Sequence, residues 1–186
     1  MIASQDRTSL GLSELLRRTA DGDQRGFEEL YRLTSAKLFG VCLRMLRERR
    51  DAEDALQEVY TTLWRRAGSF DAARASAMTW LVTLARNKCI DRLRQHRELV
   101  PDEPIDLDGV PDTQAGPATD AEQGQEYRRL QECLETLESR QRRSLREAFF
   151  SGATYNEMAT RCSVPLGTMK SWIRRGLLQL RACLES

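Results

Sequence analysis

Residues 154–175 read TYNEMATRCSVPLGTMKSWIRR, a stretch that predicts two helices joined by a sharp turn. Thr154 and Glu157 have the spacing of a capping box at the start of the first helix, and Pro165 suits the first turn of the second helix. Ala159 is small enough for the second helix to cross closely. This pattern is typical of a helix-turn-helix that reads DNA.

The second of these helices separates an apolar side from a polar side. The apolar residues, which repeat at helical spacing and predict the packed face, are Leu166, Met169, Ile173 and Leu177. The small and cationic residues, which fall mainly on the other side and are expected to meet nucleic acid, are Gly167, Thr168, Lys170, Ser171, Arg174 and Arg175. An ordinary helical hairpin with a solvated basic face would show the same spacing. Evidence from the rest of the chain is needed to distinguish these two interpretations.

Length and composition bound the class of protein. With 186 residues the chain can form one domain or two small ones. It contains no run of about eighteen apolar residues and no secretion signal at its start, so we expect a cytoplasmic protein. The five cysteines form no Cys-x-x-Cys pair, and the only histidine, His96, has no cysteine within four positions. We therefore expect no metal site, no cofactor and no catalytic Cys/His pair.

The net charge of +1 hides a strong asymmetry along the chain. Residues 1–97 carry 18 Lys and Arg against 13 Asp and Glu, residues 98–127 carry none against 9, and residues 128–186 carry 11 against 6. Two basic modules thus flank an acidic segment, and an electrostatic footprint belongs to a module rather than to the whole chain.

The acidic segment is also rich in proline and poor in large apolar residues, a composition that cannot bury enough surface to form a core. It predicts a linker over residues 98–122, between an amino-terminal domain (1–97) and a carboxy-terminal domain (123–186). Helical patterns fill both domains, and no segment alternates convincingly enough to be a strand. The predicted fold is therefore all-α. The expected helices are 10–19, 24–46, 52–67, 76–97, 122–137, 140–151, 156–161 and 166–184, with Asp23 and Asp51 as possible N-caps.

One amphipathic helix of the amino-terminal domain has an acidic face. Its apolar stripe consists of Ala52, Leu56, Val59, Tyr60 and Leu63, and its polar side carries Asp51, Asp54, Gln57 and Glu58. Such a face can simply be solvated, or it can bind a protein partner with a basic helix. A paired-carboxylate enzyme site would need burial or a metal to shift the carboxylate pKa, and no histidine lies nearby.

A second nucleic-acid signal lies further along this domain, in a loop of small residues followed by a helix. The expected DNA contacts are Phe70, Arg86, Asn87, Lys88, Arg92 and Arg94. Of these, only Asn87 has the paired donor and acceptor suited to choosing a base. Phe70 and Trp80 can alternatively fill the core while the cations keep the surface soluble.

Two stretches together resemble the extracytoplasmic-function sigma factors of bacterial RNA polymerase. DAEDALQE (51–58), followed by TWLVTLARNKCIDRLR (79–94), is similar to their region 2, and residues 154–181 are similar to their region 4. The resemblance covers nearly the whole chain apart from the first dozen residues and the linker. Both motifs occur in the order and at the separation of the family, which makes the match far more specific than a lone helix-turn-helix.

The resemblance implies a role for each set of residues. The acidic helix would dock on the clamp helices of the largest core RNA polymerase subunits, beta and beta-prime. Residues 69–78 and the helix through Asn87 would open the promoter minus-10 element and take a base out of the stack, and the helix from Leu166 would enter the major groove of the minus-35 element. The linker would thread the polymerase's positively charged channel. Such a protein is not an enzyme and is a monomer on its own.

The sequence departs from the family pattern at two positions. Ser163 stands where the family commonly has glycine in the turn, and a non-glycine residue held left-handed there costs roughly 1–2 kcal/mol. Trp172 stands where arginine is frequent, so we expect it to pack or to touch a thymine methyl, and we do not assign it to DNA.

The family resemblance also implies an inhibitor. Members are usually held inactive by an anti-sigma factor that is often tethered to the membrane, which would keep this chain at the inner face of the membrane. Cys133 and Cys183 lie at the two ends of the carboxy-terminal domain. If those ends meet, the two cysteines could form a disulfide that alters affinity for the inhibitor.

Two other classes compete with this interpretation. A helix-turn-helix repressor or activator would bind duplex operators without polymerase, but it would need a dimer interface or an effector domain. An enzyme built on Asp54 and Glu58 lacks a histidine or a metal set. Association with core polymerase separates these classes from a sigma factor.

Overall fold

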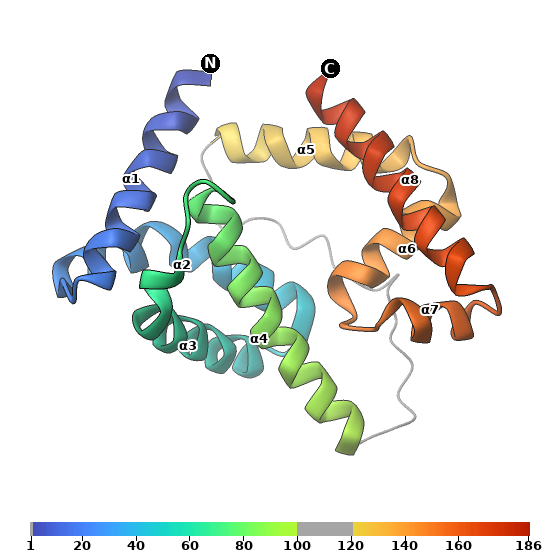
Figure 1. The fold of residues 1–186 in the computed structure, drawn as a ribbon, viewed down its shortest axis with the longest axis horizontal. Helices are drawn as coiled ribbons and strands as arrows, with labels where there is room; N and C mark the ends of the chain where they lie inside the picture. Colours follow the sequence, from blue (N-terminus) through green and yellow to red (C-terminus); the bar gives the residue numbers. More distant parts are fainter. Residues whose placement is uncertain (1, 100–120) are drawn as a thin grey trace. The chain divides into compact units, whose positions relative to one another are not determined.

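The computed structural model describes residues 2–99 and 121–186, and the secondary structure in these ranges is entirely helical (Figure 1). The chain divides into two compact units, Met1–Leu99 and Val100–Ser186. The predicted all-α fold is confirmed. The predicted linker, 98–122, lies outside the described residues except at its two ends, where helices continue into it.

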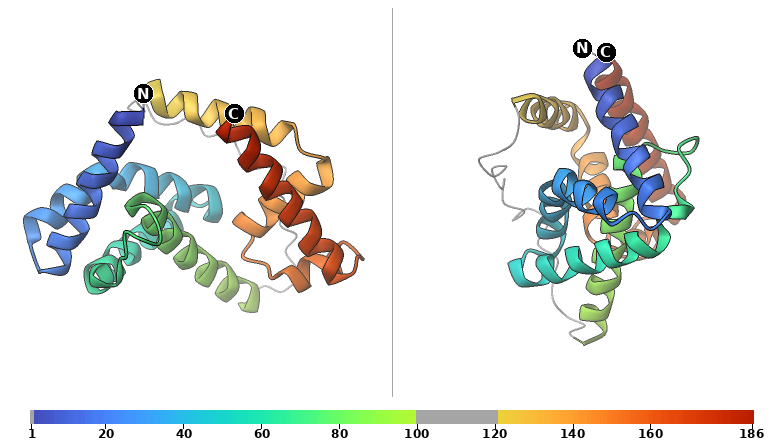
Figure 2. Two further views of the ribbon diagram at one scale, coloured as in Figure 1. Left: turned by 45° about the horizontal axis from the view of Figure 1, so that its top comes forward. Right: turned by 90° about the vertical axis from the view of Figure 1, so that its left-hand side faces the viewer.

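Unit 1 contains four long helices and one short turn of 3₁₀ helix. The elements are α1 (Ile2–Ala20), α2 (Gln24–Leu46), α3 (Arg49–Arg66), η1 (Ala67–Ser69) and α4 (Ala77–Leu99). Helix α2 packs against α1, α3 and α4, and α3 packs against α4 (Figures 1 and 2). Helix α1 is longer than the apolar periodicity predicted, because that periodicity begins only at Leu10.

The two predicted N-caps of unit 1 differ in outcome. Asp23 caps α2, where its carboxylate accepts a 2.9 Å hydrogen bond from the Arg25 backbone N–H and also binds Arg18. The Asp51 prediction is wrong, since α3 begins earlier, at Arg49, and places Asp51 in its first turn. The cap residue is Glu48, whose side chain makes no capping hydrogen bond. An acidic residue in the first turn still stabilises the helix dipole.

The core of unit 1 is built from the apolar sides of all four helices. Its largest fully buried side chains include Leu16, Leu30, Leu38, Val59, Leu63 and Leu81. Of the predicted α3 stripe, only Leu56 is not buried. The Tyr60 hydroxyl and the buried Thr34 hydroxyl form a 2.7 Å hydrogen bond, and burial raises the Tyr60 pKa to about 12.

Two cysteines also lie in this core, between α2 and α4. Cys42 and Cys89 are fully buried, and a hydrogen bond between their thiols lowers the pKa of Cys42 and raises that of Cys89. Free cysteine is among the most often buried residue types, so both thiols are part of the packing of this core.

Unit 2 contains α5 (Ala121–Glu135), α6 (Ser139–Phe150), α7 (Tyr155–Arg161) and α8 (Leu166–Glu185). Helix α8 packs against the other three (Figures 1 and 2). The core between α7 and α8 consists of Ala153, Met158, Ala159, Met169 and Ile173. No helix within the described ranges is long and apolar enough to span a membrane.

Candidate functional site

Hydrogen bonds fix the start of α7 and both ends of the turn between α7 and α8, where the Ala159 carbonyl accepts a 3.0 Å hydrogen bond from the Val164 N–H. The Thr154 hydroxyl accepts a hydrogen bond from the Glu157 N–H, and the Glu157 carboxylate accepts one from the Thr154 N–H, which is the predicted capping box. Pro165 lies just before α8 rather than inside its first turn, and its carbonyl accepts a 2.9 Å hydrogen bond from the Thr168 N–H. The axis of α8 relative to α7 is therefore set by local bonds before any partner binds.

Ser163 in this turn has a φ of +51°, in the left-handed region that favours glycine. We expect Ser163→Gly to raise the free energy of unfolding by about 0.5–1 kcal/mol, since relief of the left-handed strain outweighs the added entropy of the unfolded chain. Urea unfolding of the full chain measures this. Ser171→Gly, inside α8, is the matched control and should destabilise the chain by about 0.5 kcal/mol. A Ser163→Gly variant less stable than the parent would contradict strain in the turn.

Helix α8 presents the predicted DNA-binding residues outward. Met169 and Ile173 are buried, whereas Gly167, Lys170, Ser171, Arg174 and Arg175 are exposed and Thr168 is half-buried. The predicted packing face was wrong at its two ends, because Leu166 and Leu177 are exposed.

The packing residue that periodicity missed on α8 is Gly176. A Cβ there would lie 3.0 Å from Leu145 Cδ1 and 3.3 Å from Gln141 Cβ, so the absence of a side chain lets α6 approach α8 closely. This contact, rather than Leu177, holds the middle of α8 in place.

Trp172 packs within unit 2. Its half-buried ring lies against the α7–α8 core, and the Arg140 guanidinium lies 5.8 Å from the ring centroid. A cation over an indole face adds to the packing.

An ion pair with a buried carboxylate ties α6 to α7. The Glu147 carboxylate, with its side chain only 9% exposed, lies 2.6 Å from the Arg161 guanidinium. Sequence reasoning missed this pair because the two residues lie on different helices, 14 positions apart. A buried carboxylate with a bonded cation orients one helix against the other, since breaking the pair would leave a charge without its partner.

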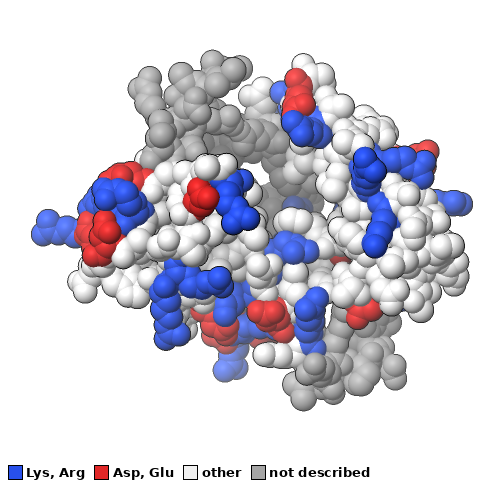
Figure 3. Space-filling model, viewed as in Figure 1, with Lys and Arg blue, Asp and Glu red and all other residues white. Residues whose placement is uncertain are grey.

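The predicted protein-binding face of α3 is exposed in full. Asp51, Asp54, Gln57 and Glu58 all lie on the solvent side, whereas Ala52, Ala55 and Val59 are buried. Blue and red side chains lie next to one another at several places on the face shown in Figure 3.

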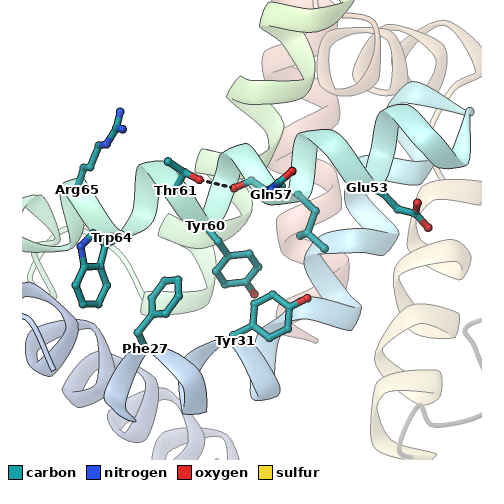
Figure 4. Close-up of a pocket in the computed structure, with 9 residues that line it drawn as sticks. Phe27, Tyr31, Glu53, Gln57, Tyr60, Thr61, Trp64 and Arg65 are labelled. Atoms are coloured by element: carbon teal, nitrogen blue, oxygen red, sulfur yellow. Dashed lines mark hydrogen bonds between the residues drawn. The ribbon is translucent and has the colours of Figure 1, made fainter. Parts of the chain in front are cut away.

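Beside this acidic face lies an open aromatic groove that sequence reasoning missed. Figure 4 shows the rings of Phe27 and Tyr31, from α2, facing those of Tyr60 and Trp64, from α3. The Phe27 and Trp64 centroids are 5.2 Å apart, and Tyr31 and Trp64 are 47% and 39% exposed. Gln57 lines the same groove, which makes the groove continuous with the acidic face. The i, i+4 spacing of both aromatic pairs was the available signal.

The loop before α4 holds Phe70 against Trp80, with ring centroids 5.9 Å apart, and both rings are half-buried. The loop is shaped by Asp71, whose carboxylate accepts a hydrogen bond from the Ala73 N–H, and by Ser76, whose hydroxyl accepts one from the Thr79 N–H. The packing interpretation therefore accounts for most of the surface of both rings.

The predicted DNA-binding residues of α4 fall into two groups. Asn87 and Arg94 are exposed, and Arg86 and Lys88 are half-buried. Arg92 differs, because its guanidinium bonds Glu58 at 2.6 Å, on the neighbouring helix α3. The structure thus brings one predicted DNA contact onto the predicted protein-binding face.

Cys133 and Cys183 are joined in a disulfide between α5 and α8, with 5.7 Å between the two Cα atoms. Cys162, in the turn after α7, is a free and exposed thiol. Among the residues that the structure describes, no cluster of His, Cys, Asp or Glu could hold a metal ion.

The two units match two separate protein families. Residues 30–98 match Sigma-70 region 2, and residues 127–180 match Sigma-70, region 4. The chain is 38% identical over 184 residues to ECF RNA polymerase sigma factor SigK of Mycobacterium tuberculosis (strain ATCC 25618 / H37Rv), which covers 96% of both chains. It is 35% identical over 177 residues to SigK of Mycolicibacterium vanbaalenii, which covers 93% of this chain and 89% of that one.

The chain is also similar to solved structures. One is Rhodobacter sphaeroides SigE in complex with the anti-sigma ChrR, at 30% identity and a TM-score of 0.45, covering 94% of this chain and 98% of that one. Another is CnrH in complex with the cytosolic domain of CnrY, at 20% identity and a TM-score of 0.42, covering 94% of this chain and 97% of that one.

Proposed function

This chain belongs to the extracytoplasmic-function sigma factors of the sigma-70 family, and from that membership we propose how its two units divide the work of promoter recognition. A sigma factor is a non-enzymatic, DNA-binding factor in transcription initiation. Family membership therefore sets aside the two rival classes, the polymerase-independent repressor and the carboxylate enzyme.

Unit 1 docks on core RNA polymerase through α3. The exposed carboxylates of Asp51, Asp54 and Glu58 supply negative charge for a basic helical target, and charge complementarity guides such encounters. The aromatic groove of Phe27, Tyr31, Tyr60 and Trp64 adds apolar area next to that charge, since aromatic rings carry much of the energy of interfaces.

The other functional side of unit 1 contacts the minus-10 element. Asn87 is exposed on α4 and can exchange a donor and an acceptor with the edge of an unstacked base. The same helix carries three cations that can contact the DNA phosphates, Arg86, Lys88 and Arg94. The loop with Phe70 is the segment that would admit the displaced strand.

Unit 2 places α8 in the major groove of the minus-35 element. The observation that carries the proposal is the hydrogen-bonded turn before α8, together with five exposed small or cationic residues along the first three turns of that helix. Met169 and Ile173, on the opposite side of α8, are buried in unit 2. The side of α8 that is free to meet DNA is therefore the one with the exposed small and cationic residues.

Reconstituted transcription tests the function. Core RNA polymerase alone should give no specific transcript, and core polymerase with this chain should start transcription from promoters of one consensus, found by sequencing the transcripts made. A chain that binds promoter-length duplex DNA tightly without polymerase would support a repressor instead. Absence of association with core polymerase would end the proposal.

Regulation by an anti-sigma factor is part of the proposal. We expect such an inhibitor to hold the chain in the cytoplasm, at the inner face of the membrane if the inhibitor is anchored there. The disulfide Cys133–Cys183 would make the affinity for it depend on redox state, because the bond fixes α5 against α8. Affinity for an inhibitor isolated by co-purification should therefore change when the chain is reduced.

The disulfide has a direct effect on stability that can be measured first. The bond closes a loop of 50 residues, so Cys133→Ser should lower the free energy of unfolding of unit 2 by about 4 kcal/mol in the chain-entropy model. Thermal unfolding without reductant measures this. Cys162→Ser, which removes a free and exposed thiol, is the control and should change little. Equal midpoints for the parent and Cys133→Ser would show that the bond does not form in solution.

A further inference from the structure

Arg92 reaches from α4 across to α3. Its Nη2 atom lies 2.6 Å from Glu58 Oε1, its Nη1 atom lies 3.9 Å from Asp54 Oδ2, and Nη1 also lies 3.4 Å from the Asp51 carbonyl oxygen. One guanidinium thus contacts three of the four residues in the proposed polymerase-docking face. Its side chain is 25% exposed, and its Nε atom is buried.

Helix geometry separates Arg92 from the residues proposed to read DNA. Asn87 and Arg94 are seven positions apart, which places them on nearly the same side of α4. Arg92 is about 140° away from Asn87 and about 160° away from Arg94 at roughly 100° per residue. Arg92 therefore projects toward α3 while the other two project toward solvent, in agreement with their exposure.

The environment keeps Arg92 charged and bound. Burial opposes its charge, but the hydrogen bond to Glu58 and the negative charges of Glu58, Asp54 and Asp51 together hold the pKa of Arg92 above its ordinary value. A partly buried pair is less screened by salt than a surface pair. Without this cation, three negative charges would repel one another within two turns of α3.

We propose that Arg92 is a positioning residue of the polymerase-docking face and that it does not contact promoter DNA. It fixes the carboxylates of Glu58 and Asp54 in the orientation that the polymerase meets. These side chains remain 48% and 54% exposed, so each keeps a surface for a basic partner. Because Arg92 also belongs to α4, the same contact joins the docking helix to the helix that carries Asn87. The inference rests on the proposed function of α3.

Arg92→Gln, Arg92→Lys and Arg94→Gln test the proposal in the full chain. Affinity for core RNA polymerase is measured by fluorescence anisotropy of the labelled chain, and unfolding of each variant is followed alongside. Arg92→Gln should bind core polymerase about tenfold more weakly, because Glu58 and Asp54 lose their fixed orientation. Arg92→Lys should bind more tightly than Arg92→Gln because it keeps the positive charge. It should not reach the affinity of the parent, because an ammonium cannot contact Glu58 and Asp54 with two separate nitrogens. Arg94→Gln should keep the affinity of the parent.

Binding of a minus-10 non-template oligonucleotide is then measured with each variant saturated with core polymerase. The Arg92→Gln holoenzyme should bind it as the parent does, and the Arg94→Gln holoenzyme should bind it more weakly with a smaller salt dependence. Unchanged core affinity together with weakened oligonucleotide binding for Arg92→Gln would overturn the proposal and place Arg92 on DNA.

A double-mutant cycle separates positioning from general stability. If Arg92 acts through Glu58, adding Arg92→Gln to a Glu58→Gln chain should weaken core binding less than twofold further. Full additivity of the two losses would overturn the proposal. Failure of the parent chain to bind core polymerase is a different result, since it would reject the proposed function of α3 itself.

Discussion

Asp54→Lys should weaken binding of the chain to core RNA polymerase by about 100-fold at low salt, or roughly 2.7 kcal/mol. Asp54 is exposed in the middle of the docking face of α3, where a lysine would meet a basic helix with like charge. The Asp54 carboxylate lies 3.9 Å from the Arg92 guanidinium, whereas the Glu58 carboxylate lies 2.6 Å from it. Replacing Asp54 therefore disturbs the contact between Arg92 and α3 less than replacing Glu58 would. Equilibrium binding of labelled chain to core polymerase, at two salt concentrations, measures the effect.

The salt dependence and a second charge reversal make this result specific. The difference between Asp54→Lys and the parent should shrink as salt screens exposed charges. Glu135→Lys makes the same charge change at an exposed position of unit 2 and should leave core affinity within about twofold of the parent. Equal losses for both variants would mean that only net charge matters, and α3 would not be the docking helix.

Helix positions were predicted from the sequence because each unit buries one regular apolar stripe per helix. The predicted boundaries of α2 and α7 differ from those observed by no more than one residue. The errors occur where a local pattern has more than one solution. Asp51 suits a cap and a first turn equally well, and α3 begins earlier because nothing in residues 49–51 stops a helix.

Predicted site residues depend more on tertiary partners. The sequence grouped Asn87, Arg94 and three other polar residues of α4 as DNA contacts, and of these only Asn87 and Arg94 are exposed. Helical spacing could not show that Arg92 would lie against α3. Its partner there, Glu58, is 34 positions earlier in the chain. The pair of Glu147 and Arg161 was missed for the same reason. A polar residue on a helix signals a polar environment, and only the packed fold shows whether that environment is solvent, ligand or another helix.

Asn87→Ala should relax base preference at a single minus-10 position. Asn87 is an exposed amide among the cations of α4, and an amide can distinguish bases through paired hydrogen bonds worth about 1–3 kcal/mol, or about 5-fold to 150-fold in binding. Holoenzyme binding to a panel of minus-10 oligonucleotides, each with one base changed, measures this. The parent should discriminate at every critical position, and the variant should lose discrimination at one of them.

Arg174→Ala, in unit 2, provides the contrasting effect on the same holoenzyme. Arg174 is exposed on the outer side of α8, where a guanidinium that contacts phosphate adds the same affinity for every DNA sequence. Its loss should therefore weaken minus-35 binding nearly uniformly and reduce the slope of log affinity against log salt concentration by about 1. The two variants are informative together because a general loss of folding or of core binding would produce the uniform pattern in both. A uniform loss for Asn87→Ala, at normal core affinity, would place that amide on the DNA backbone and leave base selection in the minus-10 element to the loop that holds Phe70.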